Sequence, residues 1–216
     1  MDIFDYIESH STPESDVLRF ITRDTYCNVL NPRMVSGHIQ GRLLAMVSRM
    51  IQPKRILELG TFTGYSALCL AEGLPDDGVL TTVEHNDELE DTIRRNLALS
   101  PLSGKINLVI DDAKVFLAKQ QRAFDFIFMD ADKREYCAYL DLLMEEKADG
   151  TSVLPIGGWL LADNTLWDGH VIDPAYDRDQ QTLALRRFND QVAADPRLDK
   201  VILPLRDGLS IIRRIS

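Results

Sequence analysis

Two apolar runs of the sequence each end in acidic or amide side chains. One run is Phe126–Met129, followed by Asp130, and the other is Trp159–Ala162, followed by Asp163 and Asn164. Four apolar residues before an acid predict a buried central strand of a parallel sheet, with the acid at its carboxyl end. Because open α/β sheets bind ligands at that edge, these side chains are candidates for a ligand site.

The side-chain types at these two strand ends favour a hard divalent cation. Asp130, Asp163 and Asn164 offer three oxygen ligands. Because none of them is Cys or His, magnesium, manganese or calcium suits the set better than zinc. Lys133 stands one helical turn beyond Asp130 and could accept a proton there. The ordinary alternatives are a helix-cap and hydrogen-bond role for the trio and, for Lys133, a surface salt bridge to Asp132 or to Glu135.

The loop after an earlier apolar run, at 55–59, contains two glycines beside an acid. Gly60 and Gly64 would let the chain turn tightly and let a ligand approach closely. Their spacing, G-x-x-x-G, is not the G-x-G-x-x-G of dinucleotide sites. Glu58 would repel a phosphate but attract an ammonium or sulfonium group.

Two further predicted strands end in acids. Glu84 follows Gly60 by 24 residues, where an acid can accept hydrogen bonds from both ribose hydroxyls of a nucleoside. Asp111 and Asp112 precede Ala113, in a position to flank an adenine ring. Any one of these acids could be a solvated strand end. Together they predict a site for a positively charged nucleoside without phosphates, and S-adenosylmethionine is such a cofactor.

Short apolar runs alternate with helical patterns from residue 54 onward. They predict strands at 55–59, 79–83, 106–110, 124–129 and 158–162, and helices near 64–73, 86–99, 112–121, 133–147 and 180–194. This alternation predicts a parallel sheet with right-handed helical crossovers. Asn86 would cap the helix at 86–99, and pairs of Glu90 with Arg94 and Asp91 with Arg95 would support it.

The C-terminal part of the sequence predicts a β-hairpin. Apolar residues at 201–205 and 209–212 flank Arg206-Asp207-Gly208, and an Asp-Gly pair between such runs is a strong hairpin signal. The predicted fold class is α/β, a doubly wound and mostly parallel seven-stranded sheet with an antiparallel C-terminal hairpin strand and helices on both faces. Residues 1–216 are expected to form a single domain, with a helical cap at 1–50 and a Rossmann-like core at 54–216.

The first 50 residues carry helical patterns of their own. Thr12 and Pro13 suggest a helix cap followed by a first-turn proline, and a second helix is expected to start at Ser36. Apolar residues recur at helical spacing after His38. They give one apolar face made of Ile39, Leu43, Leu44, Met46, Val47 and Met50.

The composition is that of an ordinary soluble globular protein with a surplus of acids. The chain has 216 residues, 45% of them hydrophobic, and a net charge of -10. This charge disfavours a nucleic-acid partner, since phosphate backbones are held chiefly by Lys and Arg. No apolar run approaches the roughly 18 to 20 residues of a membrane span, and the acidic amino terminus lacks a secretion signal. A cytoplasmic protein without membrane insertion is expected, and its three widely spaced cysteines suggest neither a disulfide framework nor a zinc site.

Four segments, in order along nearly the whole chain, carry a resemblance to a known family. They are Met34-Val35-Ser36-Gly37-His38-Ile39-Gln40-Gly41, Ile56-Leu57-Glu58-Leu59-Gly60-Thr61-Phe62-Thr63-Gly64-Tyr65-Ser66, Met129-Asp130-Ala131-Asp132-Lys133 and Asp163-Asn164-Thr165-Leu166-Trp167. With these motifs the chain resembles the cation-dependent class I O-methyltransferases, the caffeoyl-CoA and catechol O-methyltransferase group. The resemblance implies S-adenosylmethionine as cofactor, a small-molecule aromatic acceptor and, from the caffeoyl-CoA branch, a homodimer.

The resemblance also implies which residues surround the cofactor. Glu58 would bind its amino group, Gly60 and Ser66 would line its methionine part, and Glu84 would take the ribose. The remaining residues expected around it are Val35, Thr61, Ala113 and Asp130. His85, after the ribose acid, has no role fixed by the motif, and a surface position is favoured.

The metal and catalytic residues are implied in the same way. Asp130, Asp163 and Asn164 correspond to the family's metal ligands, with magnesium expected first and manganese or calcium as alternatives. Lys133 corresponds to the lysine proposed as general base, so Lys133 and Asp130 are the expected catalytic residues. A metal there could chelate two adjacent hydroxyls of an aromatic ring and activate one of them for methylation.

The acceptor pocket is expected from the stretches at 31–34 and 167–170, where Trp167 would either stack on the acceptor or pack under its loop. Three other functions fit the sequence less well. A methyltransferase for RNA or protein conflicts with the acidic charge and leaves the metal trio without a role. A nucleotide-binding oxidoreductase lacks its glycine fingerprint. A non-catalytic cofactor-binding module would have no use for Lys133 and the three oxygen ligands.

Overall fold

The computed structural model describes residues 2–216, which divide into two compact units. The first contains the residues up to Lys54 and Thr61–Ile110, and the second contains Arg55–Gly60 and Asp111–Ser216. The elements of the first unit are α1 (Ile3–Ser9), α2 (Asp16–Asn28), η1 (Pro32–Met34), α3 (His38–Ile51), α4 (Tyr65–Ala71), β2 (Val79–Glu84), η2 (Asp87–Leu89), α5 (Glu90–Ala98), η3 (Ser103–Lys105) and β3 (Ile106–Ile110). Those of the second are β1 (Arg55–Leu59), α6 (Ala113–Lys119), β4 (Phe126–Met129), η4 (Lys133–Glu135), α7 (Tyr136–Met144), β5 (Trp159–Asp163), η5 (Trp167–Ile172), η6 (Pro174–Tyr176), α8 (Gln180–Ala194), β6 (Leu198–Leu203) and β7 (Leu209–Arg214). The single domain expected over 1–216 stays a prediction.

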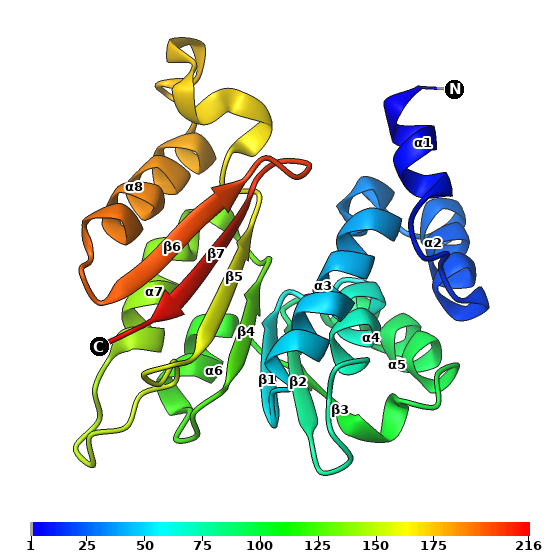
Figure 1. Ribbon diagram of the computed structural model, residues 1–216, viewed down its shortest axis with the longest axis horizontal. Helices are drawn as coiled ribbons and strands as arrows, with labels where there is room; N and C mark the ends of the chain where they lie inside the picture. The colour runs from blue at the N-terminus through cyan, green and yellow to red at the C-terminus, as the bar shows by residue number, and fades with distance from the viewer. Residues whose placement is uncertain (1) are drawn as a thin grey trace. The chain divides into compact units, whose positions relative to one another are not determined.

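The strands form a seven-stranded sheet in the order β3-β2-β1-β4-β5-β7-β6 (Figure 1). The pairs β2/β3, β1/β4 and β4/β5 are parallel, and β7 runs antiparallel to both β5 and β6. The predicted α/β class with its antiparallel C-terminal hairpin is confirmed. Strand β6 ends one residue before Pro204, which has no N–H to offer to a ladder.

The central strands of the second unit are almost entirely buried. All four residues of β4 are 0% exposed, and in β1 only Arg55 is exposed. A strand covered on both faces has no solvent side on which polar residues could alternate, so its sequence reads as one continuous apolar run. This is why Phe126–Met129 was predictable as a strand from four residues.

Helix α2 begins three residues later than Thr12 and Pro13 suggest, so that prediction is wrong. Its N-cap is Ser15, whose Oγ accepts a hydrogen bond from the Leu18 backbone N–H at 3.3 Å. The residue before the cap, Glu14, lies outside the helix, and its carboxylate accepts a hydrogen bond from the Tyr65 hydroxyl of α4. This long-range contact holds the chain extended where local capping preferences alone would start a helix.

Helix α3 also differs from its predicted form. It begins at His38 with Gly37 as N-cap and without a side-chain cap, so the start expected at Ser36 is wrong. Met46 and Met50 of the predicted apolar face are 53% and 80% exposed. Leu44 of that face is buried as predicted, and the other buried residues of α3 are small or polar and permit close packing against α4, namely Gln40, Gly41, Ala45 and Ser48.

The turn before α5 confirms one predicted cap. Asn86 Oδ1 accepts a hydrogen bond from the Glu88 backbone N–H at 3.1 Å, at the start of η2. Glu90 and Arg94 form the predicted pair at 2.6 Å, whereas Arg95 pairs with Asp24 of α2. None of the helices within residues 2–216 combines the length and the apolar character that crossing a membrane requires.

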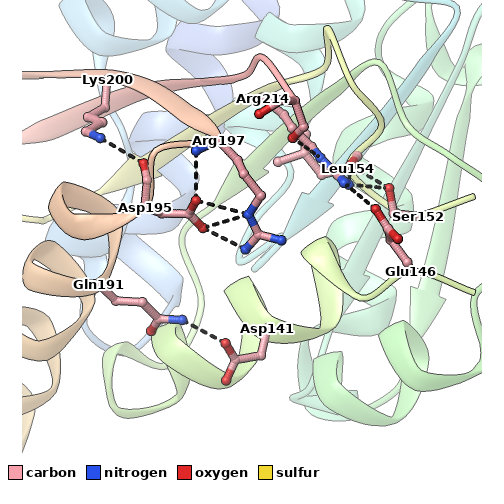
Figure 2. Close-up of polar contacts among 10 residues, drawn as sticks. Asp141, Glu146, Ser152, Leu154, Gln191, Asp195, Arg197, Lys200 and Arg214 are labelled. Atoms are coloured by element: carbon pink, nitrogen blue, oxygen red, sulfur yellow. Dashed lines mark hydrogen bonds and ion pairs between the residues drawn. The ribbon is translucent and has the colours of Figure 1, made fainter.

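A buried arginine anchors the end of β7 in the second unit. Arg214 is 2% exposed, and its guanidinium donates to Ser152 Oγ at 2.6 Å and to the Leu154 carbonyl at 2.8 Å (Figure 2). The Glu146 carboxylate lies 3.3 Å from the same group. Since β7 pairs with β5, these contacts help to fix the strand that carries Asp163.

Candidate active site

The ends of β4 and β5 lie side by side in the second unit. Their parallel register pairs Met129 with Ala162, so Asp130 and Asp163 follow at neighbouring positions. Tyr136, the first residue of α7, lies beneath both ends, and its hydroxyl is 3.1 Å from the carbonyl oxygens of Met129 and of Asp163. The two predicted acids are therefore brought together by strand pairing and by one buried hydroxyl donor.

Tyr136 is a functional residue that sequence reasoning missed. Its side chain is 0% exposed, and the ring packs edge-on against Phe188 of α8. Burial, followed by the nearby charges of Asp130 and Asp163, raises the pKa of Tyr136 well above its ordinary value. The hydroxyl consequently stays protonated and remains a donor to the strand ends over the whole physiological pH range.

Lys133 contacts Asp130 and not its other acidic neighbours. The distance from its Nζ to Asp130 Oδ1 is 2.5 Å, and the lysine is 8% exposed, with Nζ 5.3 Å from the centre of the Tyr136 ring. Hydrogen bonds from Arg134 lower the pKa of Asp132, and Glu135 pairs with Lys114 at 2.9 Å. Arg134 therefore pairs with Asp132 and Lys114 with Glu135, and the alternative salt bridge of Lys133 to either acid is not found among the described residues. The Lys133 amine instead lies at the end of β4.

Asp163 and Asn164 form the second half of this group. Asp163 is 3% exposed, and its Oδ1 accepts a hydrogen bond from the Asn164 backbone N–H at 2.8 Å. Asn164 adopts a left-handed conformation with φ 58°, which Asn tolerates better than most residues. Its Nδ2 donates to Asp207 Oδ2 at 3.3 Å, so its carboxamide oxygen is directed away from that carboxylate.

These residues fit a hard divalent cation by their chemistry. Two carboxylates and one carboxamide stand at adjacent strand ends, and all their donor atoms are oxygens. Within residues 2–216 no group of three or more His, Cys, Asp and Glu side chains is arranged to hold a metal ion. The candidate set has only two acids, and Asn164 is the third donor that it needs.

The glycine that follows β1 is required by its surroundings. Gly60 has φ 96°, a conformation that side chains disfavour, and a Cβ at this position would overlap the carbonyl oxygen of Asp130. The Asp130 backbone N–H in turn donates to the Leu59 carbonyl at 2.9 Å. Glu58, two residues before Gly60, is 0% exposed. The predicted cofactor loop and the predicted metal ligand thus share one tightly packed stretch of backbone.

In the first unit, Glu84 is held by three backbone amides. Its Oε2 accepts from the N–H groups of Thr61 and Phe62 at 3.2 and 2.8 Å, and its Oε1 accepts from that of Asn86 at 2.9 Å. Thr61 is buried, with its hydroxyl 2.5 Å from that of Thr82. A carboxylate has about four acceptor positions, so at least one remains for a ligand hydroxyl.

The other predicted cofactor residues are mostly buried. In the first unit Val35 and Ser66 are each 6% exposed, and Gly64, the N-cap of α4, has φ 86°. In the second unit Ala113 is the first residue of α6, which Asp112 caps through its side chain. His85 is exposed, as favoured from the sequence. The residues assigned to the cofactor thus belong partly to one unit and partly to the other.

The stretch at 167–170 predicted to contribute to the acceptor pocket lies in η5 of the second unit, which is interrupted by non-helical residues at Asp168 and Gly169. Trp167 and Asp168 both have positive φ, at 48° and 51°. The His170 ring stacks on that of Tyr176 with centroids 3.5 Å apart. Arg186 of α8, another residue that sequence reasoning missed, donates to the carbonyls of Val171, His170 and Asp173 at 2.9 to 3.1 Å.

Asp207, in the β6–β7 turn, contacts the same loop. Its carbonyl accepts hydrogen bonds from the N–H groups of Leu166 and Trp167 at 2.8 and 2.9 Å. In the first unit, Arg33 of the predicted acceptor stretch at 31–34 is exposed. The hairpin was predictable from Asp207 and Gly208, but its contact with the loop after β5 was not.

Comparisons with known proteins agree with this geometry. The family model described as O-methyltransferase matches residues 8–215. A caffeoyl-CoA O-methyltransferase of Stellaria longipes is 30% identical over 212 residues, which cover 94% of this chain and 85% of the relative. Tricin synthase 1 of Oryza sativa subsp. japonica is 34% identical over 196 residues, covering 84% and 75%.

Solved structures resemble the fold over nearly its whole length. The SAH-bound methyltransferase PaMTH1 of Podospora anserina has a TM-score of 0.87 and 27% identity, covering 99% of this chain and 94% of the other. The O-methyltransferase TomG of Streptomyces achromogenes, in complex with SAM, also has a TM-score of 0.87, with 25% identity and coverage of 98% and 95%. Both similar structures therefore contain the methyl donor or its demethylated product.

Proposed function

Because this chain belongs to the O-methyltransferase family and is an S-adenosylmethionine-dependent enzyme, we propose that it methylates one hydroxyl of a vicinal dihydroxy aromatic small molecule with the help of a divalent cation. The observation that carries the proposal is the pairing of the β4 and β5 ends, with Asp130 and Asp163 adjacent and Lys133 on Asp130. The names of the relatives support the acceptor class, since caffeoyl-CoA has two adjacent phenolic hydroxyls.

Asp130, Asp163 and Asn164 are the residues that would hold the cation. Their donors are all oxygens, which suits magnesium first and manganese or calcium as alternatives. A cation bound there would supply a positive charge that lowers the pKa of a chelated phenolic hydroxyl. Burial of Asp163 at 3% exposure limits its mobility and so favours a fixed ligand geometry.

Lys133 and Asp130 are the proposed catalytic residues. The transferred methyl leaves the sulfonium sulfur and bonds to the phenolic oxygen, whose proton must be taken up. Lys133 would accept that proton in its neutral amine form, and its Nζ lies 2.5 Å from Asp130 Oδ1, at the end of β4. The Tyr136 ring beneath Lys133 restricts where the amine can move.

The methyl donor is assigned to the residues named from the family resemblance. Glu84 would accept hydrogen bonds from the ribose hydroxyls, and the three amides on its carboxylate fix its orientation before binding. Glu58, which is 0% exposed, would bind the amino group of the donor, as the family resemblance implies. Val35, Gly60, Thr61, Ser66, Ala113 and Asp130 are the other proposed contacts.

Methyl transfer from radiolabelled S-adenosylmethionine to a panel of acceptors tests the proposed function. The panel contains catechols, flavonoids and hydroxycinnamoyl esters, each beside its monohydroxy analogue. We expect label in the products of vicinal diols and little in those of the analogues. Equal labelling of diols and analogues, or labelling of RNA or protein alone, would contradict the acceptor class. The homodimer and the cytoplasmic location stay predictions.

A further inference from the structure

We propose that Asp207 is a positioning residue for the Asn164 carboxamide and for the loop that begins with it. The inference rests on the proposed metal-binding function, because Asn164 is one of its three assigned ligands. Asp207 lies in the turn between β6 and β7, 43 residues away from Asn164 along the chain.

The carboxylate of Asp207 fixes which way the Asn164 amide faces. Asp207 Oδ2 accepts from Asn164 Nδ2 at 3.3 Å, and both groups are partly buried. An amide carries its nitrogen and its oxygen on opposite sides of one carbon. A carboxylate cannot donate a hydrogen bond, so it selects the nitrogen and turns the oxygen away from itself. The oxygen is the atom that a hard cation requires.

The backbone of Asp207 fixes the loop that follows Asn164. Its carbonyl accepts from the N–H groups of both Leu166 and Trp167, and the next carbonyl, of Gly208, accepts from Thr165 N–H at 3.0 Å. Each of these bonds joins the β6–β7 turn to the loop after β5. Hydrogen bonds to two consecutive carbonyls of the turn therefore fix the backbone of residues 165–167.

The backbone of this loop is strained, and the hydrogen bonds from the turn stabilise it. Asn164, Trp167 and Asp168 all have positive φ, at 58°, 48° and 51°, and none of them is glycine. Residues held in this region cost of order 1 to 3 kcal/mol each and persist only where the surroundings over-determine them. Strain of this kind commonly stands at ligand sites, and here it begins at a proposed ligand.

The turn is itself held in register with the strand that carries the ligands. Strand β7 pairs Leu209 with Asp163, and Ser210 Oγ donates to Thr165 Oγ1 at 2.9 Å. A Cβ on Gly208, whose φ is 92°, would overlap Leu166. The β5–β7 pairing thus brings the turn that contains Asp207 beside the residues that follow Asp163, and the close contact at Gly208 keeps the turn against the loop.

The binding of Mn2+ alone tests this role without turnover. Binding is measured as the decrease in the electron paramagnetic resonance signal of free Mn2+. Asp207→Ala removes the acceptor, and we expect about a 10- to 100-fold weaker Mn2+ affinity, as is typical for loss of a residue that orients a metal ligand. Asp207→Asn keeps an acceptor oxygen in place and should restore most of the affinity. Asp199→Ala, an exposed acid on the same hairpin, is the matched control and should bind as the unmodified protein does.

The outcomes separate the inference from the function on which it rests. If the unmodified protein binds no Mn2+, the metal proposal and the inference both fall. If it binds and Asp207→Ala binds equally well, only the inference falls. An Asp207→Asn affinity as weak as that of Asp207→Ala would contradict positioning, because a loss of negative charge would then explain the effect. Should Asp207→Ala not fold, Asp207→Glu, which displaces the carboxylate and keeps its charge, must bind more weakly than Asp207→Asn, and equal affinities overturn the proposal.

Discussion

The backbones of Gly60 and Asp130 are in close contact, on the side of Gly60 where any other residue would have its Cβ. The carbonyl oxygen of Asp130 fills the space of a Cβ on Gly60, and the glycine has φ 96°. One residue belongs to the loop assigned to the methyl donor, and the other is assigned to the metal. This contact means that the spacing between the two assignments is set by backbone packing and not by flexible side chains.

Gly60→Ala should therefore destabilise the protein strongly. We expect a loss of about 2 to 6 kcal/mol in the free energy of unfolding, from about 1 to 3 kcal/mol of backbone strain and a similar cost of overpacking. Chemical denaturation monitored by circular dichroism measures the change. Gly104→Ala is the matched control, because a Cβ there meets nothing within 4 Å, and it should be nearly neutral. Equal stability of the two variants would refute the close contact.

Glu84→Ala should weaken the binding of S-adenosylmethionine. Loss of one charge-assisted hydrogen bond from ribose predicts an affinity about 10- to 100-fold lower, which is about 1.4 to 3 kcal/mol. The substitution also leaves the Thr61 and Phe62 amides without their acceptor. Glu84→Gln keeps an acceptor for these amides and separates the two effects. Calorimetric affinities unchanged in both variants would contradict the ribose assignment.

Asp163→Ala should lose turnover while it retains the cofactor. The residue is assigned to the metal and to no part of the methyl donor, so the kcat should fall by more than the roughly 10- to 100-fold typical of an outer-shell partner. The affinity for S-adenosylmethionine, measured by calorimetry, should persist. Simultaneous loss of both would identify Asp163, which is almost fully buried, as a structural residue.

Asp195 should contribute stability that depends on pH. Hydrogen bonds from the Arg197 guanidinium lower its pKa below the ordinary 3.8 (Figure 2). A carboxyl group whose pKa is lower in the folded state stabilises that state at any pH above its pKa in the unfolded state. That stability is lost as the pH falls through its pKa in the folded state. Asp195→Asn should cost about 0.5 to 1 kcal/mol at pH 7. This difference should vanish between about pH 4 and pH 2, and a difference that persists at about pH 2 would argue against an ionic origin.

The sequence predicts most of the sheet and the acids at its strand ends. Buried parallel strands carry no polar alternation, so runs such as the one before Asp130 stand out, and the Asp-Gly pair at 207 and 208 marks the hairpin. Pairing of parallel strands at their carboxyl ends then brings Asp130 and Asp163 together without further information.

The residues that support these acids were not predictable, because their contacts are distant in sequence. Tyr136 reaches the Asp163 carbonyl across 27 residues, and Asp207 reaches Asn164 across 43. A tyrosine at a helix start and an aspartate in a turn each have common local explanations. The prediction of where α2 begins was wrong for the same reason, since the contact of Glu14 with Tyr65 overrides the local cap signal of Thr12 and Pro13.

The metal requirement of methyl transfer tests the central claim most directly. The purified protein is assayed with S-adenosylmethionine and a catechol acceptor in excess EDTA, and again after addition of magnesium or manganese. The account predicts that activity disappears with the chelator and returns with the metal, because Asp130, Asp163 and Asn164 then regain the cation that activates the acceptor. Full activity in excess EDTA would contradict it.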